Sequence, residues 1–435
     1  MRDSTSTLPD LPEEADASAT AWMSKLGPGL IAGAADDDPS GIATYSQAGA
    51  QFGFGMLWTL VLTYPLMVGI QIISARIGRV TGHGLATNIR RHYPLAMLYA
   101  IVGLLLLANT INIAADVAAM GDALKLVIGG QAHWYAVGFG LLSVLLQVFI
   151  PYSSYVRLLK WLTLALLTYV GTVFVVHIPW ATVAREGIAM PRLPWSGAFI
   201  TTIVAVFGTT ISPYLFFWQA SQEVEELKAD DAAHALKKAP KRARMDFSRI
   251  QLDTYVGMGF SNLVAFFIML TTAVTLHAHG VTEITSSAQA AAALKPVAGN
   301  FAFFLFAMGI IGTGLLAVPV LAGSAAYAVA GAFRWRSSLE HAPSVAPKFY
   351  GIIAVATLVG TALVFAPFDP IKGLYWSAVI NGVISVPIMG IMMLLASRCD
   401  VMGRLVIGRR LKVVGWLCTG VMAVAVVSMF VVQAG

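Results

Sequence analysis

Charged side chains are scarce in this sequence, and cysteines are scarcer still. Only 11% of the 435 residues are Asp, Glu, Lys or Arg, whereas a soluble globular protein carries about 25%. The two cysteines, Cys399 and Cys418, are too few for a disulfide framework or a cysteine-rich metal site. This composition excludes a soluble enzyme, a disordered tail protein and a nucleic-acid-binding protein.

Apolar residues, by contrast, make up 57% of the chain. One bilayer crossing takes about 20 apolar residues, so the content is enough for about eleven or twelve helices. Because lipid offers no partner for backbone polar groups, such runs form helices. We therefore predict an all-α polytopic membrane protein with about eleven transmembrane helices. Their approximate limits are 28–50, 54–75, 95–118, 133–151, 155–177, 197–220, 251–275, 298–328, 349–366, 371–396 and 411–431.

The basic residues indicate the topology. If the N-terminus is cytoplasmic, 23 of the 28 Lys and Arg lie on the cytoplasmic side and 5 lie outside. Cytoplasmic loops are the richer in Lys and Arg, so we predict a cytoplasmic N-terminus, an outer C-terminus and insertion in the cytoplasmic membrane. Residues 1–26 are acidic and lack the apolar stretch of a secretory signal, which predicts a short cytoplasmic tail.

The first apolar run contains a proline and three adjacent carboxylates, Asp36, Asp37 and Asp38. Each ionised group costs several kcal/mol at mid-membrane, so carboxylates are rare in such runs. Proline removes a backbone donor and glycine frees the backbone, so Asp38-Pro39-Ser40-Gly41 predicts an unwound break. Unwound backbone at this depth must line a cavity or be packed in protein.

The sixth run repeats this pattern in Gly208-Thr209-Thr210-Ile211-Ser212-Pro213-Tyr214. Pro213 follows Pro39 by 174 residues, close to the length of a five-helix unit. Interrupted segments at matching places in two halves are typical of the central site of a transporter. We therefore predict two five-helix repeats of opposite topology and one extra helix.

These features resemble the Nramp family of divalent-metal transporters. The opening Gly27-Pro28-Gly29, the Asp38-Pro39 break and the sixth-run break match that family in kind and order. The resemblance extends from residue 27 to the end of the chain. It implies a LeuT-type fold, a 5+5 inverted repeat with broken first and sixth helices.

On this basis we expect the first repeat at 27–180, the second at 195–398 and the extra helix within 399–435. The second repeat contains a cytoplasmic loop, 221–250. Within this loop, the segment 223–247 is acidic first and basic after. We predict that it is a solvated helix or linker that joins the two halves.

The chain departs from the family motifs at several positions. Metal-selective members have Asp-Pro-Gly-Asn and Met-Pro-His where this chain has Asp38-Pro39-Ser40-Gly41 and Ser212-Pro213-Tyr214. The asparagine and thioether ligands are thus replaced by Gly41 and Ser212, and a second family histidine falls at Gln219. In these changes the chain resembles the Nramp-related magnesium transporters, a divergent branch of the family.

The replaced ligands favour a hard cation. Thioethers suit soft transition metals, whereas carboxylate, carbonyl, hydroxyl and water suit Mg²⁺ and Mn²⁺. Magnesium keeps several waters and binds through one or two carboxylates. The resemblance implies that Asp38 supplies the charge, that Ser212 and the carbonyls near Ser40 and Thr209 supply neutral oxygens, and that Gly41 leaves room for a hydrated ion. The transported ion is then Mg²⁺ or Mn²⁺, and no cofactor is expected.

Other polar residues of the spans keep two interpretations each. Asp37 and Asp36 either attract cations at the entrance or cap the following half-helix. Asn381 in the tenth run either reaches the site or joins two helices. In the third run the acidic pair of the family is reduced to Asp116, with Ile113 at the partner position, and Asp116 is either a relay or the partner of a cation.

We therefore expect a monomeric secondary transporter that moves Mg²⁺ or Mn²⁺ by alternating access, with the cation and the lipid bilayer as its partners. Proton coupling is not expected, because Tyr214 and Gln219 do not titrate near neutral pH. Two alternatives are a proton-coupled transition-metal importer of the same family and a sodium-coupled organic-solute symporter of the same fold. A membrane enzyme is disfavoured, because a magnesium–diphosphate site needs a second acidic cluster and the spans offer only Asp116 and Asp253.

Overall fold

The structure, a computed structural model, describes residues 32–33, 35–150, 162–189, 191, 194–229, 234–339, 342–367 and 369–434. Every regular element in these ranges is a helix, which confirms the predicted all-α class. The predicted tail 1–26, residues 28–31 of the first predicted run and residues 155–161 of the fifth lie outside the described residues.

Twelve helices carry most of the fold. They are α3 (Pro39–Phe52), α4 (Leu57–Thr81), α6 (Leu95–Ile128), α7 (Ala132–Phe149), α9 (Leu167–Val175), α11 (Gly197–Thr210), α12 (Pro213–Ala229), α13 (Ala243–Thr275), α16 (Ala302–Phe333), α17 (Pro347–Leu363), α18 (Pro370–Ala396) and α20 (Arg409–Ala434). Shorter helices connect them. These include η1 (Gly53–Met56), α5 (Leu85–His92), η2 (Leu162–Leu166), α10 (Trp180–Thr182), the π-helix Val183–Ala189, η5 (His277–His279), α14 (Ser287–Ala292), α15 (Lys295–Ala298) and α19 (Cys399–Met402).

Within the described residues, eight helical stretches are long and apolar enough to cross a membrane. The number is nine if the pair Leu164–Val175 and Trp180–Ala189, bent by 111°, is one span. The first and second predicted runs form a single stretch, Pro39–Thr81, in which η1 joins α3 to α4. The ninth run is α17, which is shorter at 17 residues. Each of the eleven predicted runs therefore contains helix.

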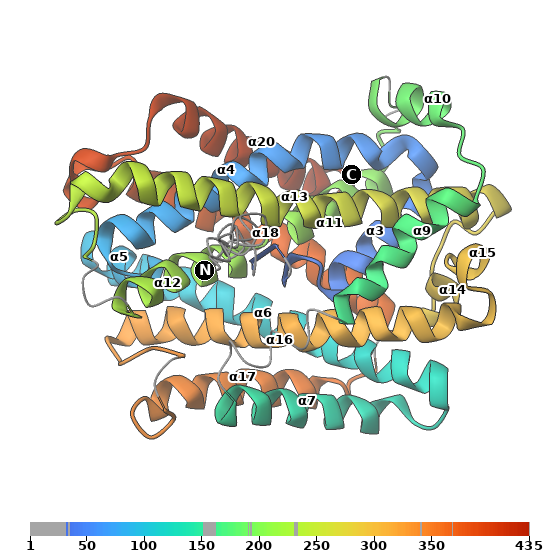
Figure 1. The fold of residues 1–435 in the computed structure, drawn as a ribbon, viewed down its shortest axis with the longest axis horizontal. Coiled ribbons are helices and arrows are strands. Elements are labelled where there is room, and N and C mark those ends of the chain that lie inside the picture. The colour runs from blue at the N-terminus through green and yellow to red at the C-terminus, as the bar shows by residue number, and fades with distance from the viewer. Residues whose placement is uncertain are drawn as a thin grey trace, which may run out of the picture.

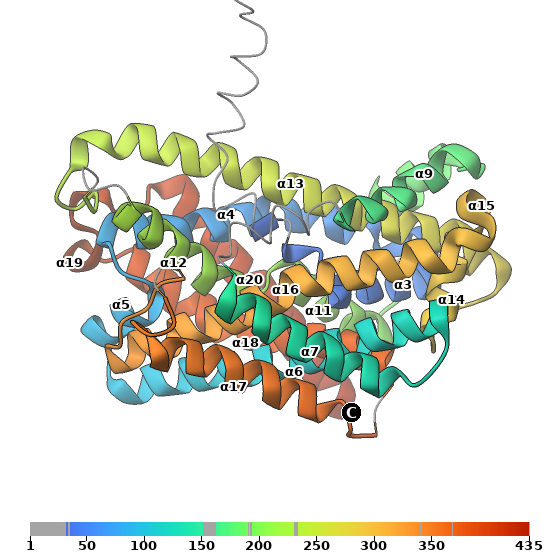
Figure 2. The ribbon, with the colours of Figure 1, turned by 60° about the horizontal axis from the view of Figure 1, so that its bottom comes forward.

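Helix α3 lies in the middle of the molecule, where it contacts α6, α11, α13, α16 and α18 (Figures 1 and 2). Helices α7 and α17 pack side by side against α6 at one edge, and α20 packs on α4, α11 and α18 at the opposite edge. In the stretch formed by α11 and α12, 94% of the apolar window is buried. The break between these two helices is thus enclosed by protein, as unwound backbone in a membrane requires.

A glycine allows α11 to approach α18 closely beside this break. A Cβ atom at Gly208 would clash with the carbonyl oxygen of Ala378 and with the backbone of Gly382. Small residues let transmembrane helices meet backbone to backbone, where van der Waals packing holds them together. The contact fixes the end of α11 against the middle of α18.

A network of ion pairs joins α4, α12 and α13 at one end of the bundle. The Nε atom of Arg79 lies 3.1 Å from Asp246 Oδ2, and its Nη1 atom lies 3.6 Å from Glu226 Oε2. The Nη2 atom of Arg249 lies 2.6 Å from Glu223 Oε2 and 3.0 Å from Glu226 Oε2. Glu223 is fully buried, so its charge depends on these two guanidinium groups.

This network corrects the prediction for the loop 221–250. Residues up to Ala229 continue α12, and α13 begins at Ala243, so only the segment between the two helices is a connection. Glu223 and Asp246 are buried, not solvated. The sequence pattern of acidic then basic residues was interpreted as a solvated surface, but these charges face one another and Arg79 across three helices.

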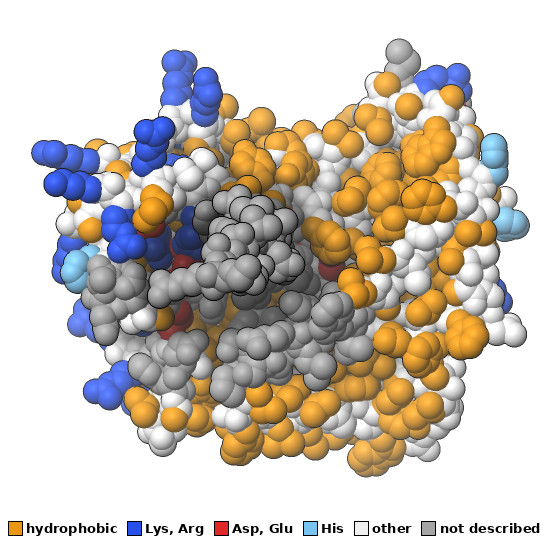
Figure 3. All heavy atoms as spheres, in the orientation of Figure 1, with side chains coloured by type: hydrophobic (Ala, Val, Ile, Leu, Met, Phe, Trp, Pro, Cys, Tyr) orange, Lys and Arg blue, Asp and Glu red, His pale blue; other side chains and the backbone are white. Residues whose placement is uncertain are grey.

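Most of the Lys and Arg side chains visible in Figure 3 gather at one end, on the left of the view, where α5 and α12 lie in Figure 1. Hydrophobic side chains cover much of the rest of this face. In the predicted topology the basic end is cytoplasmic. The network of Arg79 and Arg249 belongs to the same end.

Replacing Arg249 with Leu should destabilise the protein, because it leaves the buried carboxylate of Glu223 with Arg79 alone, at 3.9 Å. Breaking a buried ion pair costs about 3–5 kcal/mol, and the remaining arginine places the expected loss near or below the lower end of that range. The measurement is the apparent melting temperature of the purified protein in detergent.

The matched control is Arg185→Leu. Arg185 pairs with Glu186 at 2.9 Å, but its side chain is 70% exposed, and exposed pairs contribute about 0–1 kcal/mol. The melting temperature of this variant should stay near that of the wild type. Equal losses in the two variants would contradict a structural role for the buried network.

Candidate cation-binding site

Asp38 is the residue that directly precedes α3, which begins at Pro39. Its backbone is extended (φ −71°, ψ 168°), and Pro39 opens the helix. Its Oδ1 atom accepts hydrogen bonds from the backbone N–H of Gly41 at 2.7 Å and from the Ser40 hydroxyl at 2.6 Å. This is an N-cap, which the fixed φ of proline at the first helical position favours. One carboxylate oxygen is therefore used to start the helix, and the other faces the protein interior.

The second break lies between α11 and α12, at Ile211 and Ser212. The Ser212 hydroxyl lies 2.7 Å from the carbonyl oxygen of Thr209 and 2.9 Å from that of Gly208, and it can donate to one of them at a time. It thus satisfies carbonyls that the end of α11 leaves without intrahelical partners. Pro213 then opens α12. Both prolines therefore begin helices. Ser40 and Gly41, which the sequence predicts to be unwound, instead lie in the first turn of α3, so the break precedes Pro39.

The two breaks contact each other. The Tyr214 hydroxyl donates to the carbonyl oxygen of Ala35, at 3.1 Å. The Tyr45 and Thr210 hydroxyls are also 3.1 Å apart. A Cβ atom at Gly41 would lie only 3.2 Å from Thr209 Oγ1, so this glycine allows the close approach. The start of α3, with Asp38, Ser40 and Gly41, thus lies against the end of α11 at Thr209, and Ser212 is linked to Thr209 through its hydroxyl.

The third and tenth predicted runs supply polar groups to the same place. Asn112 of α6 donates from Nδ2 to Asp38 Oδ2 at 3.0 Å, and the same nitrogen lies 3.4 Å from Asp116 Oδ2. The Nδ2 atom of Asn381 in α18 lies 3.5 Å from Asn112 Oδ1. Asp116 and Asn381 therefore both belong to the polar cluster around Asp38, connected to it through Asn112.

Asp36 and Asp37 face a different helix. The Ser261 hydroxyl of α13 lies 2.7 Å from Asp36 Oδ2 and 3.0 Å from Asp37 Oδ1. Both aspartates are buried, with 0% and 3% exposure. Because Asp38 caps α3, the interpretation of Asp36 and Asp37 as the cap is wrong. The role of Asp37 at a cation entrance stays a prediction.

The carboxyl groups of the cluster have no ion-pair partner among the described residues. Asp38, Asp116 and Asn381 are at most 1% exposed, and the ion pairs of the described residues include neither Asp38 nor Asp116. Several oxygens have no hydrogen-bond partner, among them Asp116 Oδ1, Asn381 Oδ1 and Thr209 Oγ1. Buried carboxylates and unpaired oxygens are costly unless a ligand or water satisfies them. The arrangement is suited to a cation.

The donor set matches a hydrated ion better than a bare one. In the described part of the chain, no group of three or more His, Cys, Asp or Glu side chains is arranged to hold a metal ion. Asp38 is surrounded by hydroxyl and amide groups, so the protein offers few charged ligands. Magnesium is usually bound in this way, through one or two carboxylates and several retained waters.

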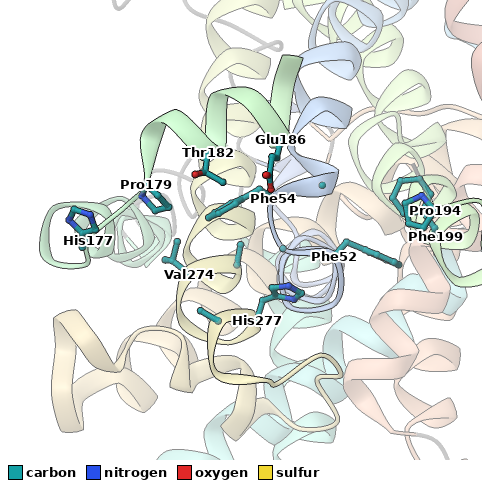
Figure 4. Close-up of a pocket in the computed structure, with 14 residues that line it drawn as sticks. Phe52, Phe54, His177, Pro179, Thr182, Glu186, Pro194, Phe199, Val274 and His277 are labelled. Carbon is teal, nitrogen blue, oxygen red and sulfur yellow. The ribbon is translucent and has the colours of Figure 1, made fainter. Parts of the chain in front are cut away.

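The cavity in Figure 4 lies apart from this cluster. It measures about 520 Å³, and its lining includes Phe52, Phe54, Phe199, Glu186 and His277. Glu186 approaches from the π-helix Val183–Ala189. His277 approaches from the opposite side, from η5, which follows α13 in the chain. None of the predicted site residues lines it, so it is not the cation site.

Sequence reasoning missed Asn112. The signal that was available is its spacing: Asn112 and Asp116 are four residues apart, so they lie on the same face of a helix. An asparagine in an apolar helix is ordinarily interpreted as a partner for a neighbouring helix. Here the neighbouring group is the capping carboxylate of another, broken helix.

A family model described as natural resistance-associated macrophage protein-like, Nramp, matches residues 29–432. The divalent metal cation transporter MntH of Klebsiella pneumoniae (strain 342) is 26% identical over 408 residues, which cover 92% of each chain. A second MntH, from K. pneumoniae subsp. pneumoniae, is 27% identical over 403 residues, which cover 91% of this chain and 90% of the other.

Solved structures share the fold at low identity. The manganese transporter of Eremococcus coleocola matches with a TM-score of 0.73 at 17% identity, over 96% of this chain and 87% of that one. Mhp1, a nucleobase-cation-symport-1 family transporter, has a TM-score of 0.57 at 14% identity, over 94% and 92% of the two chains. MhsT in complex with L-phenylalanine also reaches 0.57, at 11% identity, over 93% and 97%. These likenesses confirm the LeuT-type arrangement with broken first and sixth helices.

Proposed function

The chain belongs to the Nramp family, and from this premise we propose that it is a secondary transporter of a hard divalent cation, Mg²⁺ or Mn²⁺. The relatives named above are divalent metal cation transporters and a manganese transporter. We propose further that the chain belongs to the divergent magnesium-transporting branch of the family. Transport by a membrane carrier requires no enzymatic chemistry and no resident cofactor.

One observation carries the choice of ion: the buried Asp38 carboxylate meets only hydroxyl and amide groups of the described residues, and Ser212 stands at the thioether position. Oxygen donors favour Mg²⁺ and Mn²⁺ over softer metals. Asp38 would act as the anionic ligand, with Ser212 and carbonyls of the two breaks as neutral oxygen donors through water. Asp37, on the α13 side of the first break, would help to attract the cation.

The proposed transport cycle is alternating access. The two broken helices place the site at the centre of the bundle, and in such folds one set of helices rocks against the other around a fixed site. The protein would act as a monomer in the cytoplasmic membrane, with its N-terminus in the cytoplasm and its C-terminus outside. The distribution of Lys and Arg supports this orientation.

A second candidate function is proton-coupled import of a transition metal, as expected for metal-selective members of the family. Asp116 favours it, because a buried carboxylate next to the site can act as a relay. An organic solute is disfavoured, although Mhp1 and MhsT share the fold, because the Nramp family match covers nearly the whole chain.

Replacing Asp38 with Asn should abolish uptake of Mg²⁺ and Mn²⁺ into proteoliposomes, because it removes the proposed anionic ligand. Asparagine is also favoured as an N-cap, so α3 should keep its start. Asp38→Ala should abolish uptake as well, with an additional loss of stability of about 0.5–2 kcal/mol from the missing cap.

The control for this prediction is Asp400→Asn, which removes a carboxylate that is about half exposed and pairs with Arg398. Uptake by this variant should be unchanged. Uptake by Asp38→Asn at the wild-type rate would move the site away from the first break.

Ser212→Met should shift the preference of the transporter toward Cd²⁺, because it places a thioether beside the site. The measurement is the ratio of Cd²⁺ to Mg²⁺ uptake in proteoliposomes. The control is Ser143→Met, which adds the same group to a buried position of the edge helix α7. An unchanged ratio in Ser212→Met would exclude Ser212 from the site.

Uptake should proceed without proton flow. A divalent ion that enters a negative cell gains about 4.6 kcal/mol per 100 mV, so the membrane potential alone concentrates it. The measurement is the internal pH of proteoliposomes during Mg²⁺ or Mn²⁺ uptake at a fixed potential. Acidification that scales with cation influx would favour the proton-coupled alternative and assign Asp116 to the relay.

A further inference from the structure

We propose that the amide of Asn112 stands where the cation binds, and that Asn112 and Asp116 complete the cation site together with Asp38. In the state described here, the two N–H groups of this amide take the place of the positive charge. When the cation arrives, the amide turns over and presents its oxygen to the ion. This inference rests on the proposed function and names further residues of the same site.

The amide of Asn112 lies between two carboxyl groups. A single nitrogen, Asn112 Nδ2, lies 3.0 Å from Asp38 Oδ2 and 3.4 Å from Asp116 Oδ2. An amide nitrogen carries two hydrogens, so it can donate one to each carboxylate. The two acids come from different helices, the broken first span and α6, and their oxygens converge on this one donor group. Such a point, between two carboxylates, is where a divalent cation is most stabilised.

Two oxygens near this amide have no hydrogen-bond partner among the described residues. Asp116 Oδ1 and Asn381 Oδ1 are buried and have no hydrogen-bond partner in the described structure. Both side chains have no solvent exposure. Leaving a buried acceptor unpaired costs about 1–3 kcal/mol, so the present arrangement is incompletely satisfied. A hydrated cation would supply both its charge and the hydrogen atoms of its waters to Asp116 Oδ1.

The contact between the side-chain amides of Asn112 and Asn381 can be reversed. Asn381 now donates to Asn112 Oδ1 across 3.5 Å, a long contact for a hydrogen bond. If Asn112 turns by 180°, its Oδ1 faces the cation and its Nδ2 faces Asn381. A matching turn of Asn381 then satisfies its orphaned oxygen by accepting from Asn112. The reversal replaces two donors at the site with one oxygen ligand and pairs Asn112 Nδ2 with Asn381 Oδ1.

The proposed site explains how the chain could bind a cation although it lacks the asparagine ligand of the family motif. An amide oxygen is lost at Gly41, and Asn112 restores one from a different helix. Two carboxylates and one amide oxygen match the double positive charge of a hard ion and leave room for retained water. In this arrangement Asp116 is a partner of the cation.

The experiment is calorimetric titration of the purified full-length protein with Mg²⁺ and Mn²⁺ at fixed pH. Asn112→Leu and Asp116→Asn should each weaken affinity by about 10- to 100-fold, the usual loss when a group that orients or completes a metal site is removed. Asn112→Asp should bind within a few-fold of the wild type, because it keeps an oxygen at this position. The double variant Asn112→Leu/Asp116→Asn should lose less binding free energy than the sum of the losses in Asn112→Leu and Asp116→Asn, because both residues act on the same ion.

The matched control is Asn109→Leu. Asn109 lies one turn earlier on α6 and donates to Leu321 O and Ser324 Oγ, away from the carboxylates. Its removal should leave cation affinity unchanged, although it costs stability. Melting temperatures of all variants separate loss of fold from loss of binding.

Infrared difference spectra on addition of Mg²⁺ provide a second readout. The wild type should show carboxylate bands that respond to the ion, and Asp116→Asn should lose part of this response. Wild-type affinity in Asn112→Leu and Asp116→Asn would overturn this inference, while loss of binding in Asp38→Asn would leave the proposed function intact. Wild-type affinity in Asp38→Asn as well would instead overturn the proposed function.

Discussion

The structure depends on one constraint, the presence of a carboxylate at a helix break in the interior of a membrane protein. Asp38 has no bulk water and no basic partner among the described residues, so each of its oxygens needs a defined role. One oxygen caps α3, and the other points to the polar cluster of α6. The break therefore provides both the start of a helix and one side of the proposed cation site. A covalently adjacent proline fixes the two functions in the same place.

The first break leaves backbone groups that need hydrogen-bond partners, and the second break supplies one of them. The carbonyl of Ala35 accepts from Tyr214, and Gly41 packs against Thr209. In turn, α4 holds the start of α12 through Gln71, which donates to the carbonyl oxygen of Leu215 at 3.1 Å. The ion pairs of Arg79 and Arg249 connect the same helices farther along. A displacement of α12 would therefore alter the site and the basic end of the bundle together, which is the coupling that alternating access needs.

The sequence was sufficient to predict the class of fold and both breaks, because hydropathy and proline act locally. The partners of Asp38 depend on which helices meet, and local pattern carries little of that information. Asn112 was overlooked for this reason, since its importance comes from a carboxylate 74 positions away. The charges of 223–247 were interpreted as solvated for the same reason, because one of their counterions, Arg79, lies on a distant helix. The resemblance to Nramp proteins identified Asp38, Thr209 and Ser212 as a group, which stays a prediction; in the structure Gly41 packs against Thr209, and the Ser212 hydroxyl reaches the carbonyl of Thr209.

Selectivity in such a site follows from how charge and solvation are shared. A site with many thiolate or thioether ligands strips the ion and rewards soft metals. In the proposed site the described protein groups are hydroxyls, amides and carboxylates, so a bound ion would keep water to fill its coordination shell. Magnesium holds its water most firmly among the candidate ions, so the cost of binding is lowest where water can stay. In the proposed site, the same retained water would reach an oxygen that direct contact would not, Asp116 Oδ1. A hydrated ion therefore satisfies more of this cluster than a bare one, and the loss of the family's bulky ligands favours it.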